Sequence, residues 1–162
     1  MSHTAAVLTV SDGVSYGTRQ DASGEALAQL LSEQGFRVVA RRVVPDEIDR
    51  IAPEIVDLAS IARLVVTTGG TGFGPRDVTP EATRQVIERE AAGMAFLMIK
   101  TGLEVTPMAA LSRGIVGSVG SALVVNLPGS PQGAIENLGA LLPVIPHALQ
   151  LLAGETEHSP PD

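Results

Sequence analysis

Short apolar runs alternate along the chain with segments in which apolar residues recur every three or four positions. Residues 5–10, 36–44 and 64–67 are the runs, and they predict buried strands because they are short, rich in β-branched residues and bounded by turn-forming residues. Helical spacing follows at residues 22–31 and 48–59. Strands that alternate with helices predict an α/β fold with a mostly parallel sheet covered on both faces.

The second half of the chain gives a less regular pattern. Helices are expected over residues 81–90 and 94–103, and again from Pro131 to about Leu152. Two apolar pieces in residues 115–125 are separated by glycine and serine, and they fit either a hairpin or two successive strands.

Prolines and the polar C-terminus set the expected boundaries. Pro53 falls inside a helical pattern, where proline costs about 3 kcal/mol, so we expect a kink or a helix that begins near it. Residues 154–162 (GETEHSPPD) are polar and predict a disordered tail. No linker divides the rest, so residues 1–153 are expected to form a single domain.

Composition narrows the classes of function. The 162 residues carry 11 basic and 18 acidic side chains, a formal net charge of −7, which makes nucleic acid and anionic membranes poor partners. The absence of cysteine excludes disulfides and thiolate sites. No apolar run reaches membrane-span length, and the first ten residues lack a secretory pattern, so a cytoplasmic protein is expected.

Three loops follow predicted strands, at residues 11–17, 68–79 and 126–131. In open α/β sheets, ligands bind outside the carboxyl ends of the strands, so these loops should converge on one site. Residues of the first and third loops that could contact a ligand are Ser11, Asp12, Asn126, Pro128, Gly129 and Ser130. For Asn126 and Ser130, ordinary turn formation is the alternative.

The glycine-rich part of the second loop is the strongest single signal. Gly69, Gly70 and Gly72 allow the backbone to approach a ligand, and successive N–H groups can surround a phosphate. The hydroxyls of Thr68 and Thr71 could donate hydrogen bonds to a phosphate, and Arg76 could bind a phosphate oxygen. The alternative is that the loop is a tight turn that binds no ligand. We expect Thr79 to cap the following helix, with Pro80 at its first position.

Two common nucleotide motifs do not fit this loop. A Walker A loop requires a lysine after its last glycine, and none follows here. A dinucleotide fingerprint requires a third glycine where Pro75 stands. The pattern therefore indicates phosphate rather than NAD.

Asp46 and Asp77 are the catalytic candidates because Mg²⁺ bound to phosphates is usually held by one or two carboxylates. The alternatives are that Asp46 caps a helix and that Asp77 is a turn residue paired with Arg76. Asp12 equally fits an Asx turn. Arg113 could bind a second anionic group, whereas three scattered histidines give no support for a metal site or a triad.

Several of these segments together resemble one family. Residues 67–83 (TTGGTGFGPRDVTPEAT) are similar to the signature of the MogA/MoaB family, which includes molybdopterin adenylyltransferases and gephyrin-like G domains. The similarity extends to residues 9–12, 21–24, 44–46, 111–113 and 126–131.

The resemblance implies a three-layer α/β/α domain that assembles as a homotrimer, with hexamers as the alternative for MoaB-type members. It also implies transfer of AMP from Mg²⁺-ATP to the terminal phosphate of molybdopterin, with release of pyrophosphate and transfer of the product to a molybdenum insertase. By position, Asp46 and Asp77 match the residues for Mg²⁺ and catalysis, residues 69–72 match the glycine loop, and Ser112 matches a pterin-side residue.

Two other functions remain open at this point. A MoaB-like protein could bind pterin or nucleotide without turnover, although Asp46 and Asp77 favour the enzyme. A dinucleotide oxidoreductase would bind NAD tightly, and the missing fingerprint argues against it.

Overall fold

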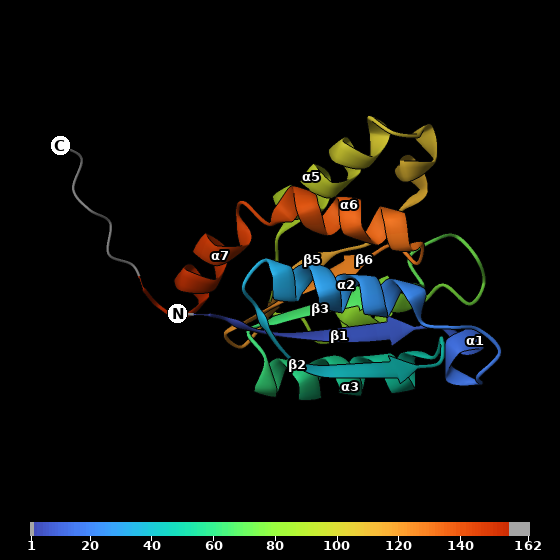
Figure 1. Cartoon of the computed structure of the whole chain (residues 1–162), viewed down its shortest axis with the longest axis horizontal. Helices are drawn as coiled ribbons and strands as arrows, with labels where there is room; N and C mark the ends of the chain where they lie inside the picture. The colour runs from blue at the N-terminus through green and yellow to red at the C-terminus, as the bar shows by residue number, and fades with distance from the viewer. Residues whose placement is uncertain (1, 156–162) are drawn as a thin grey trace.

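The computed structural model describes residues 2–155, which fold around one six-stranded mixed sheet (Figure 1). The strand order is β2-β1-β3-β6-β5-β4. The first four strands in this order are parallel, and the last two are antiparallel to their neighbours. Their bounds are β1 Thr4–Val10, β2 Arg37–Val44, β3 Leu64–Thr68, β4 Arg89–Glu90, β5 Val116–Val119 and β6 Ala122–Leu127.

Helices cover both faces of the sheet, as the continuous apolar runs predict. Successive residues of β1 point to opposite faces, so Val7 belongs to one buried cluster and Leu8 to the other. The Val7 cluster is covered by α2 (Ala22–Glu33), α5 (Ala92–Leu103), α6 (Pro131–Leu141) and α7 (Ile145–Leu152). The Leu8 cluster is covered by α3 (Ile48–Ile61) and α4 (Thr79–Arg84). The predicted α/β class, with a mostly parallel sheet, is confirmed.

The chain reverses its direction of travel across the sheet at β1, since β2 lies on one side of it and β3 on the other. The carboxyl ends of β1, β2, β3 and β6 therefore lie along one edge of the sheet. This reversal opens a crevice between neighbouring loops, which is where α/β sheets bind ligands.

Residues 115–125 form a hairpin rather than two parallel strands. β5 and β6 pair in antiparallel fashion, with Val119 opposite Ala122. Gly120 has φ +58°, which suits the first central position of a two-residue hairpin turn.

The helix predicted over residues 81–90 is wrong. α4 ends at Arg84, and the chain then extends into β4. The N–H of Glu88 donates to the Ser118 carbonyl at 2.8 Å, and the N–H of Ala91 donates to the Val116 carbonyl at 2.7 Å. Pairing with the edge of the sheet satisfies these backbone groups and replaces the last helical turn.

Other boundaries differ less. α3 begins at Ile48 with Pro53 in its interior, so a helix that begins near Pro53 is wrong, and the kink stays a prediction. Two short elements were not predicted, α1 (Asp12–Ser15) and the 3₁₀ helix η1 (Pro107–Leu111). Most of the predicted disordered tail, residues 156–162, lies outside the described residues.

Within residues 2–155, no single helix has the length and apolar character needed to cross a membrane. The pair α6 and α7 meets the length and composition together, with a bend of 63° between them. Leu138 and Leu149, one from each helix, are fully buried in the core against the sheet.

Candidate functional site

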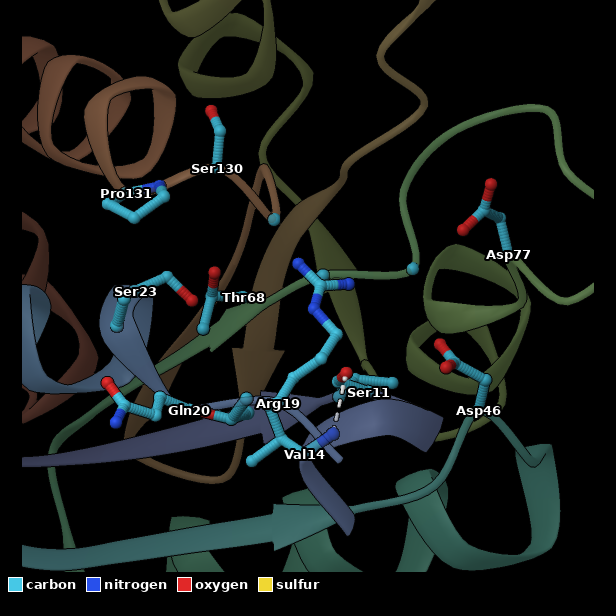
Figure 2. Close-up of a pocket in the computed structure, with 16 residues that line it drawn as sticks. Ser11, Val14, Arg19, Gln20, Ser23, Asp46, Thr68, Asp77, Ser130 and Pro131 are labelled. Carbon is cyan, nitrogen blue, oxygen red and sulfur yellow. Dashed lines mark hydrogen bonds between the residues drawn. The ribbon is translucent and has the colours of Figure 1, made fainter. Parts of the chain in front are cut away.

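A pocket of about 450 Å³ lies at the carboxyl ends of the four parallel strands (Figure 2). Each strand contributes the residues that follow it, so the pocket is a direct consequence of the strand order. We call it the strand-end pocket. It is lined by Thr9, Val10, Ser11, Val14, Arg19, Gln20, Ala22, Ser23, Asp46, Thr68, Gly69, Gly70, Asp77, Gly129, Ser130 and Pro131.

Two glycines form the wall of this pocket because no other residue fits there. Gly69 and Gly70 have φ values of +103° and +69°, which L-residues rarely adopt. A Cβ on Gly69 would lie 2.2 Å from the carbonyl oxygen of Val10, and one on Gly70 would lie 2.3 Å from the Thr79 hydroxyl. The loop can therefore cross the end of β1 and reach α4 only with glycine at both positions.

Thr79 has a different role from the predicted cap. Val78 is the residue before α4, and no side chain caps the helix. The buried Thr79 hydroxyl instead donates to the Gly69 carbonyl at 2.9 Å, and the Thr79 N–H donates to the Gly70 carbonyl at 3.0 Å. The hydroxyl is used to hold the glycine loop and is not available for the helix end.

The glycine loop is also joined to the loop after β6. The Thr68 hydroxyl donates to the Pro128 carbonyl at 2.7 Å, and the Gly69 N–H donates to the Leu127 carbonyl at 3.1 Å. Ser130 caps α6 by accepting from the N–H of Gly133 at 3.1 Å. The two loops thus form one hydrogen-bonded wall of the pocket.

Asp46 and Asp77 both line the strand-end pocket. Asp46 accepts from the N–H of Asp12 at 2.8 Å and does not cap α3, because Glu47 occupies that position without a side-chain bond. Burial raises the pKa of the Asp46 carboxyl, and the negative charges of Asp12 and Asp77 add to this, while the Asp12 backbone bond opposes it.

The Asp77 carboxylate is held by its own loop. It accepts from the N–H of Gly74 at 2.8 Å, and side chains on Gly72 or Gly74 would clash with it. It does not pair with Arg76, so the predicted alternative of a turn pair is wrong. The glycines on either side allow the loop to fold around this carboxylate.

This donor set fits Mg²⁺ better than a metal that needs three or more protein ligands. Among residues 2–155, no group of three or more histidine, cysteine or carboxylate side chains is placed to hold a metal. Mg²⁺ typically uses one or two carboxylates together with water and substrate phosphates. Asp46 and Asp77 supply two carboxylates beside a glycine loop, which matches that requirement.

Asp12 and Arg76 pair with each other and do not line the pocket. The Arg76 guanidinium donates to both Asp12 oxygens, at 3.0 and 2.9 Å, and lowers the pKa of that carboxyl. The Asp12 side chain also accepts from the N–H of Asp46 at 3.0 Å. Both side chains therefore join the loops after β1, β2 and β3, and their contacts with phosphate stay a prediction.

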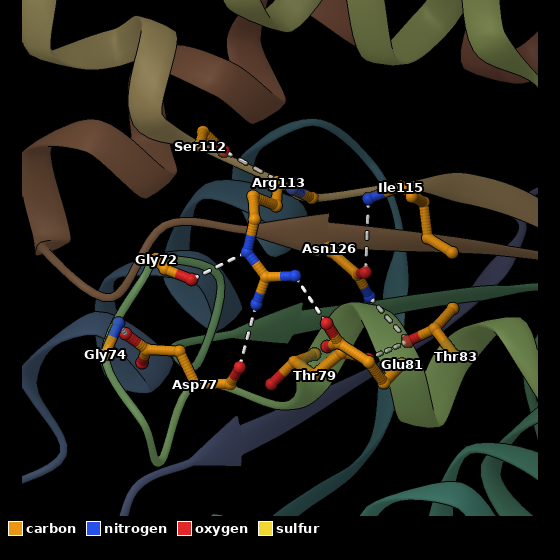
Figure 3. A network of polar contacts seen from close by, with 11 residues as sticks. Gly72, Gly74, Asp77, Thr79, Glu81, Thr83, Ser112, Arg113, Ile115 and Asn126 are labelled. Carbon is orange, nitrogen blue, oxygen red and sulfur yellow. Dashed lines mark hydrogen bonds and ion pairs between the residues drawn. The ribbon is translucent and has the colours of Figure 1, made fainter.

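Arg113 holds the Asp77 loop (Figure 3). Its guanidinium donates to the carbonyls of Gly72 and Asp77, both at 2.8 Å, and forms an ion pair with Glu81. It also lies 5.5 Å from the centre of the Phe73 ring. Arg113 lines neither the strand-end pocket nor its neighbour, so its contact with a second anionic group stays a prediction, whereas its contacts with the loop are observed.

The predicted ligand contact of Asn126 is wrong. Only 1 % of Asn126 is exposed, and its amide bonds to the Ile115 N–H and to the hydroxyls of Thr67 and Thr83. The residue joins β3, β6 and α4 inside the molecule. The side-chain amide of Asn126 thus has its hydrogen-bond partners inside the protein.

A second pocket of about 300 Å³ adjoins the first, and Ser130 lines both. We call it the helix pocket because α5, η1 and α6 form most of it, and its character is more apolar. It is lined by Thr71, Gly72, Met98, Ile99, Gly102, Thr106, Met108, Ala109, Leu111, Ser112, Pro128, Ser130, Gly133, Glu136 and Asn137.

Most predicted site residues therefore lie in one pocket or the other. The strand-end pocket contains Ser11, Asp46, Thr68, Gly69, Gly70, Asp77, Gly129 and Ser130, and the helix pocket contains Thr71, Gly72, Ser112, Pro128 and Ser130. The lining residues that sequence reasoning missed include Arg19, Gln20, Ala22 and Ser23, together with the apolar helix residues. The first group could have been found from Asp21, which caps α2 and so extends the first loop past Gly17.

Comparison with known proteins identifies a single family. The family described as "Probable molybdopterin binding domain" matches residues 6–147. "Gephyrin" of Dictyostelium discoideum is 41 % identical over 167 residues, which cover 96 % of this chain, although the chain spans only 23 % of that protein's length.

Relatives of similar length match over nearly their whole chains. "Molybdopterin adenylyltransferase" of Helicobacter pylori strain J99 is 40 % identical over 152 residues, covering 91 % of this chain and 86 % of that protein. The crystal structure of the molybdopterin biosynthesis enzyme MoaB from Thermus thermophilus superposes with a TM-score of 0.88 at 49 % identity, covering 94 % of this chain and 97 % of the other.

Proposed function

The chain belongs to the molybdopterin-binding domain family, and from that premise we propose that it is a molybdopterin adenylyltransferase of molybdenum cofactor biosynthesis. The observation that carries this proposal is the junction of two pockets at Ser130. An adenylyl transfer requires two substrates whose phosphates meet, and adjoining pockets of different character provide such an arrangement.

The character of each pocket suggests its substrate. The strand-end pocket combines the glycine loop with Asp46 and Asp77, which suits the phosphates of ATP. The helix pocket has apolar walls formed by Met98 and Ile99, together with polar groups such as Ser112, which suits a pterin ring system.

The reaction is a single displacement at phosphorus. An oxygen of the molybdopterin phosphate attacks the α-phosphorus of ATP, the bond to the oxygen between the α- and β-phosphates breaks, and pyrophosphate leaves with the electron pair. The attacking phosphate is already ionised near neutral pH, so no general base is required. This agrees with the linings of both pockets, which contain no histidine among the described residues.

The protein's own contribution is alignment and charge neutralisation. A Mg²⁺ ion held by Asp46 and Asp77 would neutralise charge on the phosphates. Asp77 is oriented by the Gly74 N–H and by Arg113, and Asp46 by the Asp12 N–H. The glycine loop brings backbone rather than side chains to the pocket wall, which lets a phosphate approach closely.

Assembly and location follow from the same family, and we include them in the proposal. The proposed assembly is a homotrimer, and exposed apolar side chains on α5 and just after it, including Phe96, Leu103 and Val105, support contacts between subunits. We place the protein in the cytoplasm as one domain spanning residues 1–153, with its adenylylated product passed to a molybdenum insertase.

The test is turnover by the purified protein. Incubation with molybdopterin, ATP and Mg²⁺ should release pyrophosphate and form adenylylated pterin, and omission of Mg²⁺ should abolish both. Binding of molybdopterin without pyrophosphate release would instead support a MoaB-like binding protein. Failure to bind molybdopterin would contradict the proposal altogether.

A further inference from the structure

One basic side chain, that of Arg19, lines the strand-end pocket. Arg19 lies on the connection between α1 and α2, and in Figure 2 its side chain extends across the pocket toward the glycine loop. The other charged residues in the lining are Asp46 and Asp77. Without Arg19, the protein would offer only negative side-chain charges to an incoming polyphosphate.

The other arginines near this edge already have acidic partners. Arg41 pairs with Asp21, Arg76 with Asp12, and Arg113 with Glu81. Arg19 makes no ion pair among residues 2–155. Its charge is therefore available to a ligand, whereas theirs is committed to holding loops together.

The local structure fixes where Arg19 points. Its backbone N–H donates to the Gly13 carbonyl at 3.1 Å, and the Thr18 N–H and hydroxyl donate to the same oxygen. The stem of Arg19 passes over Gly13, where an added Cβ would lie 2.7 Å from the arginine Cδ. Glycine at position 13 thus leaves the space that the stem needs on its way into the pocket.

We propose that Arg19 binds the phosphate chain of the nucleotide in the strand-end pocket and thereby selects triphosphate over monophosphate. The inference rests on the proposed function. A guanidinium can donate two parallel hydrogen bonds to phosphate oxygens, and it offsets the repulsion between that phosphate chain and the two carboxylates. Arg19 lines the pocket with Gly69 and Gly70 and is absent from the helix pocket, which assigns it to the nucleotide.

The test compares ligand affinities of Arg19→Gln with those of the native protein by calorimetry. Affinity for ATP and for inorganic pyrophosphate should fall by about ten- to a hundredfold, as loss of a charge-assisted hydrogen bond predicts. Affinity for AMP should change by less than about threefold, and affinity for molybdopterin should not change. Arg19→Lys should restore part of the loss, because it keeps the charge but not the planar pair of donors.

Two further variants serve as controls. Arg37→Gln removes the same charge from an exposed position at the start of β2, at the opposite edge of the sheet, and should leave every affinity unchanged. Gly13→Ala keeps all charges but displaces the Arg19 stem, so it should lower the affinity for pyrophosphate, as Arg19→Gln does. Circular dichroism confirms that each variant is folded.

Three results would overturn the inference: unchanged pyrophosphate affinity in Arg19→Gln, an equal loss in Arg37→Gln, or a loss confined to molybdopterin. These outcomes are separate from failure of the proposed function. If the native protein binds ATP through Arg19 but releases no pyrophosphate with molybdopterin, adenylyl transfer fails and the role of Arg19 stands. If turnover occurs and Arg19→Gln binds pyrophosphate as tightly as the native protein, adenylyl transfer stands and the role of Arg19 fails.

Discussion

The strand-end pocket and the helix pocket adjoin at Ser130, yet they are built in opposite ways. The first consists largely of loop residues and backbone, placed by four parallel strands whose ends lie along one edge. The second consists largely of side chains on α5, η1 and α6. A site made from strand ends is fixed by topology, whereas a site made from helix faces depends on how the helices pack.

This difference suggests that each pocket binds a different part of the reaction's two substrates. Phosphates require N–H groups, cations and carboxylates at defined places, and a loop anchored at both ends supplies them. A ring system requires an apolar wall of suitable shape, which helix side chains can supply and vary. Substitutions in one pocket should therefore affect one substrate more than the other.

Asp77→Asn should have the largest effect and should act on the strand-end pocket alone. Loss of this carboxylate is expected to reduce kcat by at least about a hundredfold, because neutralisation of charge at the phosphates contributes several kcal/mol to transition-state stabilisation. Molybdopterin binding should change little. Asp49→Asn, at an exposed position on α3, is the matched control in a pyrophosphate-release assay. A variant that retains more than half of native activity would exclude Asp77 from catalysis.

Gly69→Ala tests whether the backbone of the strand-end pocket is obligatory. An alanine there must adopt φ near +103° and place its Cβ against the Val10 carbonyl, so unfolding free energy should fall by about 2 kcal/mol or more. The melting temperature would drop by about 4–8 °C. Gly139→Ala, on an exposed turn of α6 with no neighbour near its Cβ, should instead stabilise by about 0.5–1 kcal/mol. Equal effects of the two changes would contradict the proposed constraint.

Arg113→Gln tests a positioning residue that belongs to neither pocket. Loss of its bonds to Gly72 and Asp77 should loosen the loop, so kcat should fall about tenfold while the Kd of molybdopterin changes by less than about threefold. Arg113→Lys should recover only part of the activity, because one ammonium group cannot reach all three partners. Arg89→Gln, on the short edge strand β4, is the control. A large change in pterin affinity would assign Arg113 to binding instead.

Ile99→Ala tests the helix pocket separately. Removal of part of its apolar wall should lower the affinity for molybdopterin about fivefold, as loss of about 1 kcal/mol of apolar contact predicts, and should leave the affinity for ATP unchanged. Ile61→Ala, at the exposed end of α3, should change neither affinity. Fluorescence titration with each substrate measures both values, and a loss of ATP affinity in Ile99→Ala would mean that the pockets do not divide the substrates.

Asp46→Asn should have the smallest effect on stability, and whether it raises or lowers the melting temperature is informative. The pKa of Asp46 is raised in the folded state, chiefly by burial, so the ionised form destabilises the fold at pH above the folded-state pKa. This cost disappears as pH falls through that pKa. Asp46→Asn should therefore melt higher than the native protein at pH 7, by no more than about 4 °C, and the difference should vanish below the ordinary aspartate pKa. A lower melting temperature at pH 7 would contradict the sign.

The sequence predicted the strand-end pocket well, for a physical reason. Parallel strands leave a signature of short apolar runs, and their carboxyl ends must lie together, so the glycine loop, Asp46 and Asp77 could be assigned to one site. The family resemblance is confirmed by the match over residues 6–147. Arg19 was missed because its role depends on a turn around Gly13, which sequence periodicity does not show.

Four of the predicted ligand-binding residues share a feature that the sequence does not show. Asp12, Arg76, Arg113 and Asn126 have side chains that suit a ligand, but each is used by another part of the protein. Their partners are 11 to 64 residues away along the chain. Local sequence cannot reveal such pairs, and the helix pocket was largely missed for the same reason, since α5 and α6 meet only through tertiary packing.

The most direct test of the two-pocket arrangement is whether both substrates bind at once. Molybdopterin affinity is measured by titration with and without saturating α,β-methylene ATP and Mg²⁺, since this analogue cannot release pyrophosphate. Adjoining pockets predict a ternary complex, with the Kd of molybdopterin changed by less than about threefold. Competition, in which molybdopterin is displaced as the analogue saturates, would show that the two ligands share one pocket and would contradict the arrangement.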